Sequence, residues 1–208
     1  MYYPVTISWF LRKVVYPQYL WGMPVTDKSV YLSFDDGPHP EITPFVLEEL
    51  RKAGAEASFF CIGKNVAAHQ RVYAQVLQEG HAAGNHSYHH LNGWKTPQDV
   101  YVKDIALAQQ QMDTKLYRPP YGKITRGAAR RVQQELGLRV VMWSVLSGDF
   151  DRALSPEACL RNVISNVKPG SIVVFHDSEK AFERLRYALP RVVDYFGGMG
   201  YVFKKISV

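Results

Sequence analysis

Short apolar runs recur along the chain without alternation between apolar and polar positions. Five of these runs are rich in β-branched and aromatic residues, and they cover residues 30–34, 57–62, 138–145, 171–175 and 201–206. Strands with this pattern are buried on both faces, as in a parallel sheet covered by helices. We therefore predict parallel strands over these five runs.

Helices are predicted between the runs from their start and stop signals. A hydroxyl residue followed by proline predicts a side-chain N-cap with proline at the first helical position, and it occurs at Thr43-Pro44, Thr96-Pro97 and Ser155-Pro156. Glycines that can adopt a left-handed conformation predict helix ends, at Gly54, Gly80 and Gly137. Strands that alternate with helices predict an α/β fold.

The first predicted strand ends at two adjacent carboxylates, Asp35 and Asp36. A metal-dependent active site would account for the pair, because one carboxylate binds a cation while the other acts on a proton. An ordinary solvated turn accounts for it equally well, because Gly37 and Pro38 are typical turn residues. The pair alone does not decide between the two interpretations.

Other titratable side chains also come shortly after predicted strands. Asp149 follows the run 138–145, and His176 follows the run 171–175. Because parallel strands point their carboxyl ends at one edge of the sheet, residues far apart in the sequence meet there. Asp177 comes next to His176 and predicts a carboxylate near an imidazole, the side chain best suited to donate a proton near neutral pH. We expect these groups to lie near the paired carboxylates.

Four of the seven histidines fall within ten positions, at His81, His86, His89 and His90. The spacing of His86 and His90 would place two imidazoles on one face of a helical turn, which suits a metal ion, and His86 with His89 would serve almost as well. Two histidines and one aspartate leave open positions on zinc or a similar ion, as a catalytic site requires. The cluster predicts a metal site and leaves its second histidine open.

Arg118 lies in a segment that is stiff because two prolines follow it. Pro119 and Pro120 fix the backbone, while the guanidinium of Arg118 carries a permanent charge and five donors. A surface arginine on a rigid loop is one interpretation. If Arg118 instead faces Asp35, it keeps that carboxylate ionised and oriented.

Composition predicts one compact domain. With 208 residues, 47% of them apolar, the chain can bury a substantial core.

A net charge of +6 suits an anionic partner, but the basic residues are scattered and form no arginine-rich helix, so we expect no nucleic-acid binding. Cys61 and Cys159 allow at most one disulfide, which fits a reducing compartment. We expect a monomer.

Residues 1–27 are predicted to be an N-terminal extension of a catalytic domain that covers residues 28–208. Prolines and a basic pair interrupt its apolar stretch, so we expect neither a secretory signal nor a spanning helix, which needs ~18 to 20 apolar residues. The extension either packs on the domain, which we favour, or lies at a membrane interface through residues such as Trp9, Phe10 and Trp21. We expect a cytoplasmic protein, free or at the inner face of the membrane.

Five ordered segments resemble the motifs of the NodB-like polysaccharide deacetylases, carbohydrate esterase family 4: residues 33–38, 86–90, 118–121, 148–150 and 174–177. The resemblance extends from about Lys28 to Val208. It implies a distorted (β/α)₇ barrel that removes N-acetyl or O-acetyl groups from sugars with one divalent metal, usually zinc. Cobalt, manganese and nickel suit the same ligands.

The resemblance also implies roles for individual residues. Asp36, His86 and His90 correspond to the metal ligands, which resolves the choice of the second histidine. Asp35 corresponds to the general base and would be oriented by Arg118. The metal would acidify water and polarise the acetyl carbonyl, the base would take a proton, and hydroxide would attack.

The remaining implied roles concern the oxyanion, the leaving group and the substrate. The backbone N–H of Tyr121 would help the metal to hold the tetrahedral oxyanion. His176, oriented by Asp149, would protonate the leaving group. The substrate would contact Pro120, Tyr121 and Phe150.

The fourth motif departs from the pattern of the family, which is usually DxxDW. Leu146 replaces the first aspartate and Phe150 replaces the tryptophan. The retained Asp149 is the residue expected to hold the catalytic acid, so we expect catalysis to survive. Phe150 changes the wall of the acetyl pocket, and the identity of the sugar and the choice between N- and O-acetyl groups stay open.

Two other functions are compatible with the same residues. NodB-like proteins also hydrolyse other C–N bonds or act on lipid-linked sugars, which the aromatic N-terminal segment and the positive charge keep as an alternative. A catalytically inactive relative would bind carbohydrate without turnover, but such proteins usually lose a metal ligand or the base first. Acetate release that a chelator abolishes would separate the enzyme from the binding protein.

Overall fold

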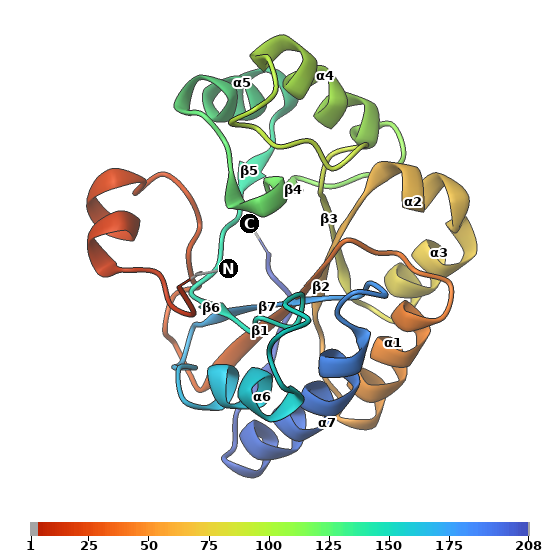
Figure 1. Ribbon diagram of the computed structural model, residues 1–208, viewed down its shortest axis with the longest axis vertical. Helices are drawn as coiled ribbons and strands as arrows, with labels where there is room; N and C mark the ends of the chain where they lie inside the picture. Colours follow the sequence, from red (N-terminus) through yellow and green to blue (C-terminus); the bar gives the residue numbers. More distant parts are fainter. Residues whose placement is uncertain (1–3, 208) are drawn as a thin grey trace.

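The computed structural model describes residues 4–207 and contains a curled sheet of parallel strands with helices outside it (Figure 1). Along the chain the strands are β1 (Ser29–Asp35), β2 (Ser58–Cys61), β3 (Ala82–Asn85), β4 (Leu116–Tyr117), β5 (Arg139–Val140), β6 (Val145–Leu146), β7 (Ile172–His176) and β8 (Val202–Phe203). Their order in the sheet is β5-β4-β3-β2-β1-β7-β6, and β8 pairs with β1. The parallel pairings confirm the predicted α/β class and distorted barrel.

Helices surround most of this sheet. They are η1 (Leu11–Val15), α1 (Ile42–Lys52), α2 (Gly63–Ala68), α3 (Gln70–Gln78), α4 (Gln98–Gln109), η2 (Pro120–Gly122), α5 (Arg126–Leu136), α6 (Pro156–Ile164) and α7 (Phe182–Gly198). In Figure 1 they follow the outside of the sheet, and the red N-terminal segment occupies the side between α5 and α6. Within residues 4–207, none of the helices is long and apolar enough to cross a bilayer.

The central strand β1 determines where the chemistry lies. All seven of its residues are buried, and its register with β7 places Asp35 opposite His176. Phe34 stacks against Phe59 of β2 and Phe175 of β7, with ring centroids 5.0 Å and 6.1 Å apart. Because the three strands are parallel, their carboxyl ends meet at one edge, as the sequence predicts.

Four of the five predicted strands are confirmed, and the run 138–145 is wrong as a single strand. It divides into β5 and β6, because the chain between them changes partners: Val141 N–H donates to Tyr117 O, whereas Met142 N–H donates to Leu20 O. Strands β3 and β4 have no counterpart in the apolar pattern. β3 contains polar and glycine positions, and β4 has only two residues.

The helix signals are partly right. The Ser155 hydroxyl caps α6 by accepting from the Ala158 N–H at 3.2 Å, and Gly137 ends α5 in the left-handed conformation. Thr43 is not an N-cap, because α1 begins at Ile42 and the Thr43 hydroxyl donates to a buried carboxylate instead. The predicted cap at Thr96 is also wrong, since Pro97 is the N-cap of α4 and no side chain caps it.

The N-terminal segment bridges the two ends of the curled sheet. Thr6 pairs with Val145 of β6 at one end, and Leu20 pairs with Val141, just after β5, at the other. Trp21 is buried, whereas Trp9 and Phe10 are exposed. The segment therefore contains a packed part and an exposed part, and the first three residues lie outside the described range. The boundary at residue 28 stays a prediction.

Candidate active site

Asp36 follows β1 in a left-handed conformation (φ 81°) that turns its side chain towards two histidines. Asp36 Oδ1 lies 3.2 Å from His90 Nε2 and 3.7 Å from His86 Nε2. This oxygen is buried and makes no hydrogen bond of good geometry. A buried carboxylate oxygen without a hydrogen-bond partner costs free energy, so a cation bound at this oxygen would stabilise the folded chain.

The two histidines come from a loop, and the predicted helical turn is wrong. Ser87 and His90 both have positive φ, near 60°, and the Ser87 N–H donates to Asn85 Oδ1 at 2.8 Å. The His86 N–H donates to the Cys61 carbonyl at 2.9 Å. The i, i+4 spacing therefore brings the imidazoles together through two left-handed residues after β3, and not through helical periodicity.

His89 points to a different partner. Its Nδ1 lies 2.5 Å from Asp104 Oδ1 of α4, and Asp104 Oδ2 accepts from the backbone N–H groups of Tyr88 and His89 at 3.0 Å each. The sequence interpretation missed this role of Asp104, whose only signal is an acid inside an otherwise apolar helix face. The loop is thereby anchored so that His90, and not His89, joins Asp36 and His86.

The outer nitrogens of the two histidines orient both rings. His86 Nδ1 lies 2.8 Å from the Arg118 carbonyl, to which it donates, and His90 Nδ1 lies 3.1 Å from the Tyr121 hydroxyl. Because a carbonyl only accepts, the Nδ1 of His86 carries the proton and its Nε2 keeps a lone pair towards Asp36, while the Tyr121 hydroxyl orients the ring of His90. A tetrahedral ion with bonds of about 2.1 Å separates its ligands by roughly 3.4 Å, so the observed spacing of the donor atoms fits one divalent metal ion.

The electrostatics of the cluster also suit a cation. Burial alone would raise the pKa of Asp36, but its contact with His90 and the surrounding imidazoles outweigh burial and lower the pKa below its usual range. Burial lowers the pKa of His86 to about 4, so this imidazole is neutral at pH 7. A charged carboxylate and a neutral imidazole are the forms that bind metals.

Asp35 lies against Arg118 beside this cluster. Arg118 is fully buried, and its Nη1 donates to Asp35 Oδ1 at 2.6 Å and to Ser33 Oγ at 2.8 Å. Its Nη2 donates to the Met142 carbonyl at 3.0 Å, and its guanidinium lies 3.9 Å from the centroid of the Phe60 ring. The guanidinium therefore holds the side chain of Asp35 in one orientation.

His176 lies against Asp149 on the other side of Asp36. Asp149 accepts from both the Nδ1 and the backbone N–H of His176, each at 2.7 Å. Burial alone would lower the pKa of His176, but the charge of Asp149 and its hydrogen bond outweigh burial and raise the pKa to about 9. The imidazole is therefore protonated at neutral pH, with Nε2–H free to donate.

Asp177, which the sequence predicts near the His176 imidazole, does not take that position, because Asp149 does. Asp177 Oδ1 accepts from the Gly37 N–H at 3.0 Å, and its Oδ2 accepts from the Thr43 hydroxyl at 2.5 Å. A Cβ on Gly37 would lie 2.1 Å from Asp177 Oδ2, so only glycine fits there. Asp177 thus fixes the turn that carries Asp36.

Comparison of the sequence with known proteins shows which family the chain belongs to. Residues 22–141 match the family model described as "Polysaccharide deacetylase". A peptidoglycan-N-acetylglucosamine deacetylase from Bacillus cereus is 34% identical over 206 residues, which are 95% of this chain and 96% of that protein. The chain belongs to the polysaccharide deacetylase family.

Other members of the polysaccharide deacetylase family support the same assignment. A chitooligosaccharide deacetylase from Azorhizobium caulinodans is 35% identical over 72% of this chain and 73% of that protein. A solved peptidoglycan N-acetylglucosamine deacetylase, in complex with 4-naphthalen-1-yl-N-oxidanyl-benzamide, has a TM-score of 0.87 and 29% identity, with 95% of each chain covered. The fold is that of carbohydrate esterase family 4.

Two aromatic rings flank the donors of this polysaccharide deacetylase. Tyr121 is exposed, follows the buried Pro120 with φ 60°, and packs edge-on against His90 with centroids 4.6 Å apart. Phe150 packs edge-on against His176 at 5.3 Å. The rings therefore border the metal side and the acid side, as expected for walls of a substrate site.

Proposed function

We propose that this chain is a metal-dependent hydrolase that removes N-acetyl groups from N-acetylated amino sugars in a glycan. The observation that carries the proposal is the cluster of Asp36, His86 and His90, with the Asp35–Arg118 pair and His176 at the same edge of the sheet. The names of the relatives support the substrate class, since one acts on peptidoglycan N-acetylglucosamine and another on chitooligosaccharides.

Asp36, His86 and His90 would hold one divalent ion, for which zinc is our choice over cobalt, manganese or nickel. When bound, the ion supplies Lewis acidity, which polarises an acyl carbonyl and acidifies water. Three protein donors leave positions open for those oxygens. Asp36 is ionised and His86 is neutral at neutral pH, because the pKa values of both are lowered, so neither has to lose a proton when the ion binds.

Asp35 is proposed to take the proton of the attacking water. Its carboxylate is buried and paired with Arg118, a cation that does not deprotonate in proteins. Arg118 Nη1 donates to Oδ1, which leaves Oδ2 to accept the proton. A positioned general base of this kind accelerates a reaction by about 10²- to 10⁴-fold.

His176 is proposed to protonate the leaving amine. Asp149 occupies Nδ1, so the proton that is transferred comes from Nε2. Amide nitrogen leaves poorly as an anion, and the raised pKa of His176, about 9, keeps the imidazolium available at neutral pH. We place the backbone N–H of Tyr121 against the oxyanion, because its left-handed conformation between Pro120 and Gly122 fixes its direction.

Acetate release from N-acetylated chitooligosaccharides and from peptidoglycan tests this proposal. We expect release to stop after chelation and to return when zinc is added. Metal content measured by mass spectrometry should fall below detection in Asp36→Ala and His90→Ala, while the matched variant His89→Ala keeps its metal, because His89 faces Asp104. Full acetate release by the metal-free protein would overturn the proposal, and loss of metal in His89→Ala alone would overturn the ligand assignment.

The monomeric state, the cytoplasmic location and the absence of nucleic-acid binding stay predictions.

A further inference from the structure

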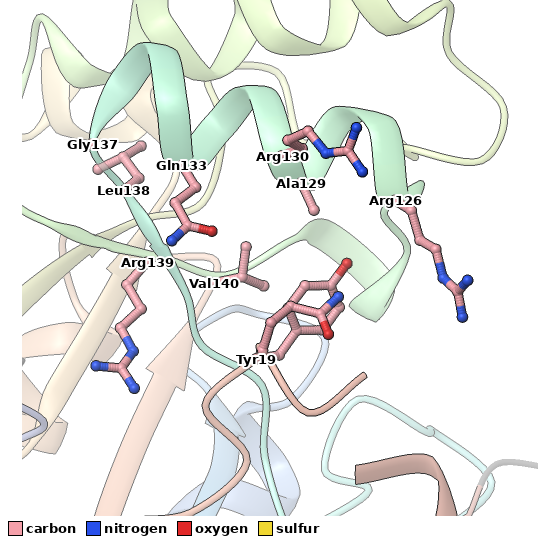
Figure 2. A pocket seen from close by; sticks show the side chains of 10 residues that line it. Tyr19, Arg126, Ala129, Arg130, Gln133, Gly137, Leu138, Arg139 and Val140 are labelled. Carbon is pink, nitrogen blue, oxygen red and sulfur yellow. The ribbon is translucent and has the colours of Figure 1, made fainter. Parts of the chain in front are cut away.

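A pocket lies on the outer wall of the barrel, between α5, the start of β5 and the N-terminal segment. Its volume is about 540 Å³, and the side chains that border it include Tyr19, Arg126, Arg130, Gln133 and Arg139. Figure 2 shows Arg126 and Arg130 on α5, Arg139 on the chain that leaves the helix, and Tyr19 facing the helix from below. None of the residues that form the metal cluster lines it.

The polar side chains around this pocket are cationic or neutral. Its described lining contains three arginines and two glutamines and no acid. Within residues 4–207, none of the three guanidiniums forms an ion pair. By contrast Arg131, the next residue of α5, binds both Asp99 and Glu135 at 2.6 Å. The chain therefore neutralises the arginine that faces away from the pocket and leaves those around it unpaired.

The positions of these arginines do not stabilise α5. Arg126 is the first residue of the helix, where the macrodipole disfavours a cation, and no acid occupies the first turn. Arg130 lies four residues further on, so the two like charges repel each other on one face. Helix formation therefore does not account for them, whereas a bound anion would remove both unfavourable terms.

Tyr19 brings a buried hydroxyl to the pocket, next to the side chain of Gln18. Its side chain is 7% exposed, and its hydroxyl is buried without a hydrogen bond of good geometry. The ring stacks on Tyr16 at 5.3 Å, and the guanidinium of Arg126 lies 5.5 Å from the Tyr16 centroid. A buried hydroxyl beside cationic donors is satisfied by a ligand with several acceptor oxygens.

We infer that this pocket binds a phosphate group. A carboxylate carries one charge and pairs with one guanidinium, whereas a phosphate carries up to two charges and offers oxygens in several directions to the arginines and to Tyr19. The positive net charge of the chain attracts such a ligand from solution. Neither the deacetylation nor the metal cluster requires this site.

The phosphate can come from a free anion or from a phospholipid headgroup. The exposed part of the N-terminal segment adjoins the pocket, because Arg126 Nη2 donates to the Val15 carbonyl at 3.4 Å. Trp9 and Phe10, which precede η1, are 65% and 61% exposed, and aromatic side chains of this kind enter the interfacial layer of a bilayer. The two sources give different results in the experiment below.

The test uses metal-loaded protein and two probes. Calorimetric titration with inorganic phosphate, against chloride at the same ionic strength, detects a free anion. Cosedimentation with phosphatidylcholine vesicles, with and without phosphatidylglycerol, detects a headgroup. The pocket variant is Arg130→Gln with Arg139→Gln, and the control with the same charge change is Arg71→Gln with Lys103→Gln, on the exposed faces of α3 and α4.

We expect the pocket variant to weaken binding at least about tenfold to one of the probes, because charge-assisted hydrogen bonds are lost, while the control variant binds normally. Tyr19→Phe should weaken the same binding by a smaller factor without lowering the melting temperature. If the pocket variant binds inorganic phosphate more weakly, the ligand is a free anion. If it binds only the phosphatidylglycerol vesicles more weakly, and Trp9→Ser has the same effect, the ligand is a headgroup.

Three outcomes overturn the inference: no binding of either probe, equal losses in the pocket and control variants, or phosphate binding that persists in the pocket variant and disappears with the metal. Acetate release serves as the check of folding, since neither arginine contacts the active site and both double variants should retain it. A pocket without phosphate binding leaves the deacetylase proposal intact.

Discussion

Two buried pairs flank the metal cluster, and they differ in the kind of partner. Asp35 is paired with Arg118, and Asp149 is paired with His176. In the first pair the cation is permanent, so the carboxylate stays an acceptor. In the second pair the cation itself titrates, and the fully buried Asp149 raises the pKa of His176 to about 9. The comparison shows how the same carboxylate group makes a base on one side and an acid on the other.

Removing the carboxylate charge of the first pair should have the largest effect. Asp35→Asn keeps the shape but cannot accept the proton, so we expect kcat/KM for acetate release to fall about 10²- to 10⁴-fold. Metal content should stay at the wild-type level, because Asp35 is not in the ligand cluster. Wild-type activity in this variant would show that another group takes the proton.

Replacing Arg118, the permanent cation, tests the same pair through its other member. Arg118→Gln leaves Asp35 buried without its ion pair, which we expect to lower the free energy of unfolding by about 3 to 5 kcal/mol. Chemical denaturation measures it. Arg118→Lys is the matched control, since it keeps the charge, and it should recover part of the loss. Equal stability of the glutamine and lysine variants would contradict the role of the charge.

Breaking the second pair should move the pH dependence. Asp149→Asn removes the charge that raises the pKa of His176, so the imidazolium is lost at lower pH and activity at pH 7 falls about 10- to 100-fold. The alkaline limb of the kcat/KM profile reports this pKa. A bound cation repels the imidazolium, so that limb lies below pH 9 in the loaded enzyme and shifts further down in the variant. An unchanged limb would assign it to another group.

The pair also predicts how stability depends on pH. The folded-state pKa of His176 is raised above the unfolded value of 6.5, so its contribution is complete below pH 6.5 and is lost as pH rises to about 9. Denaturation of the metal-free protein between these pH values measures the loss. Asp149→Asn should reduce this pH dependence, and an identical slope in both proteins would contradict the assignment.

The smallest effect is expected at the wall beside the acid. Phe150 contacts His176 edge-on at 5.3 Å, an arrangement worth about 0.5 to 1.5 kcal/mol. Phe150→Trp, which restores the usual residue of the family, should therefore change kcat/KM by no more than roughly tenfold, mostly through KM. A larger change, in kcat, would show that the ring orients the acid as well as bordering the substrate.

The histidine cluster shows which metal ligands the spacing of the sequence can predict and which it cannot. The spacing of His86 and His90 predicts two ligands, but the helical turn behind that argument is absent, and the backbone instead takes positive φ at Ser87 and His90. Asp104 then turns His89 away. Spacing alone could not separate His89 from His90, because the choice depends on a carboxylate fifteen residues later in α4.

The sequence predicted helix ends correctly where the contacts that stabilise them lie within a few residues. The Ser155 cap and the Gly137 helix end were predicted because both depend on neighbouring backbone groups. Thr43 has the same signal as Ser155, yet its hydroxyl donates to Asp177, which is 134 positions away. A residue with two competing partners is assigned wrongly when only one of them is near in the sequence.

The sequence by itself determined the α/β class, the strand ends that carry the reactive side chains, and the five motifs that indicate the family. Those features depend on periodicity and residue type, which are local. Only the tertiary structure decided which side chains share a partner: Arg118 supports Asp35 through its side chain and His86 through its carbonyl. The tertiary structure also sets the protonation states of Asp36 and His176, because the opposing charges that outweigh burial at both groups come close only once the chain is folded.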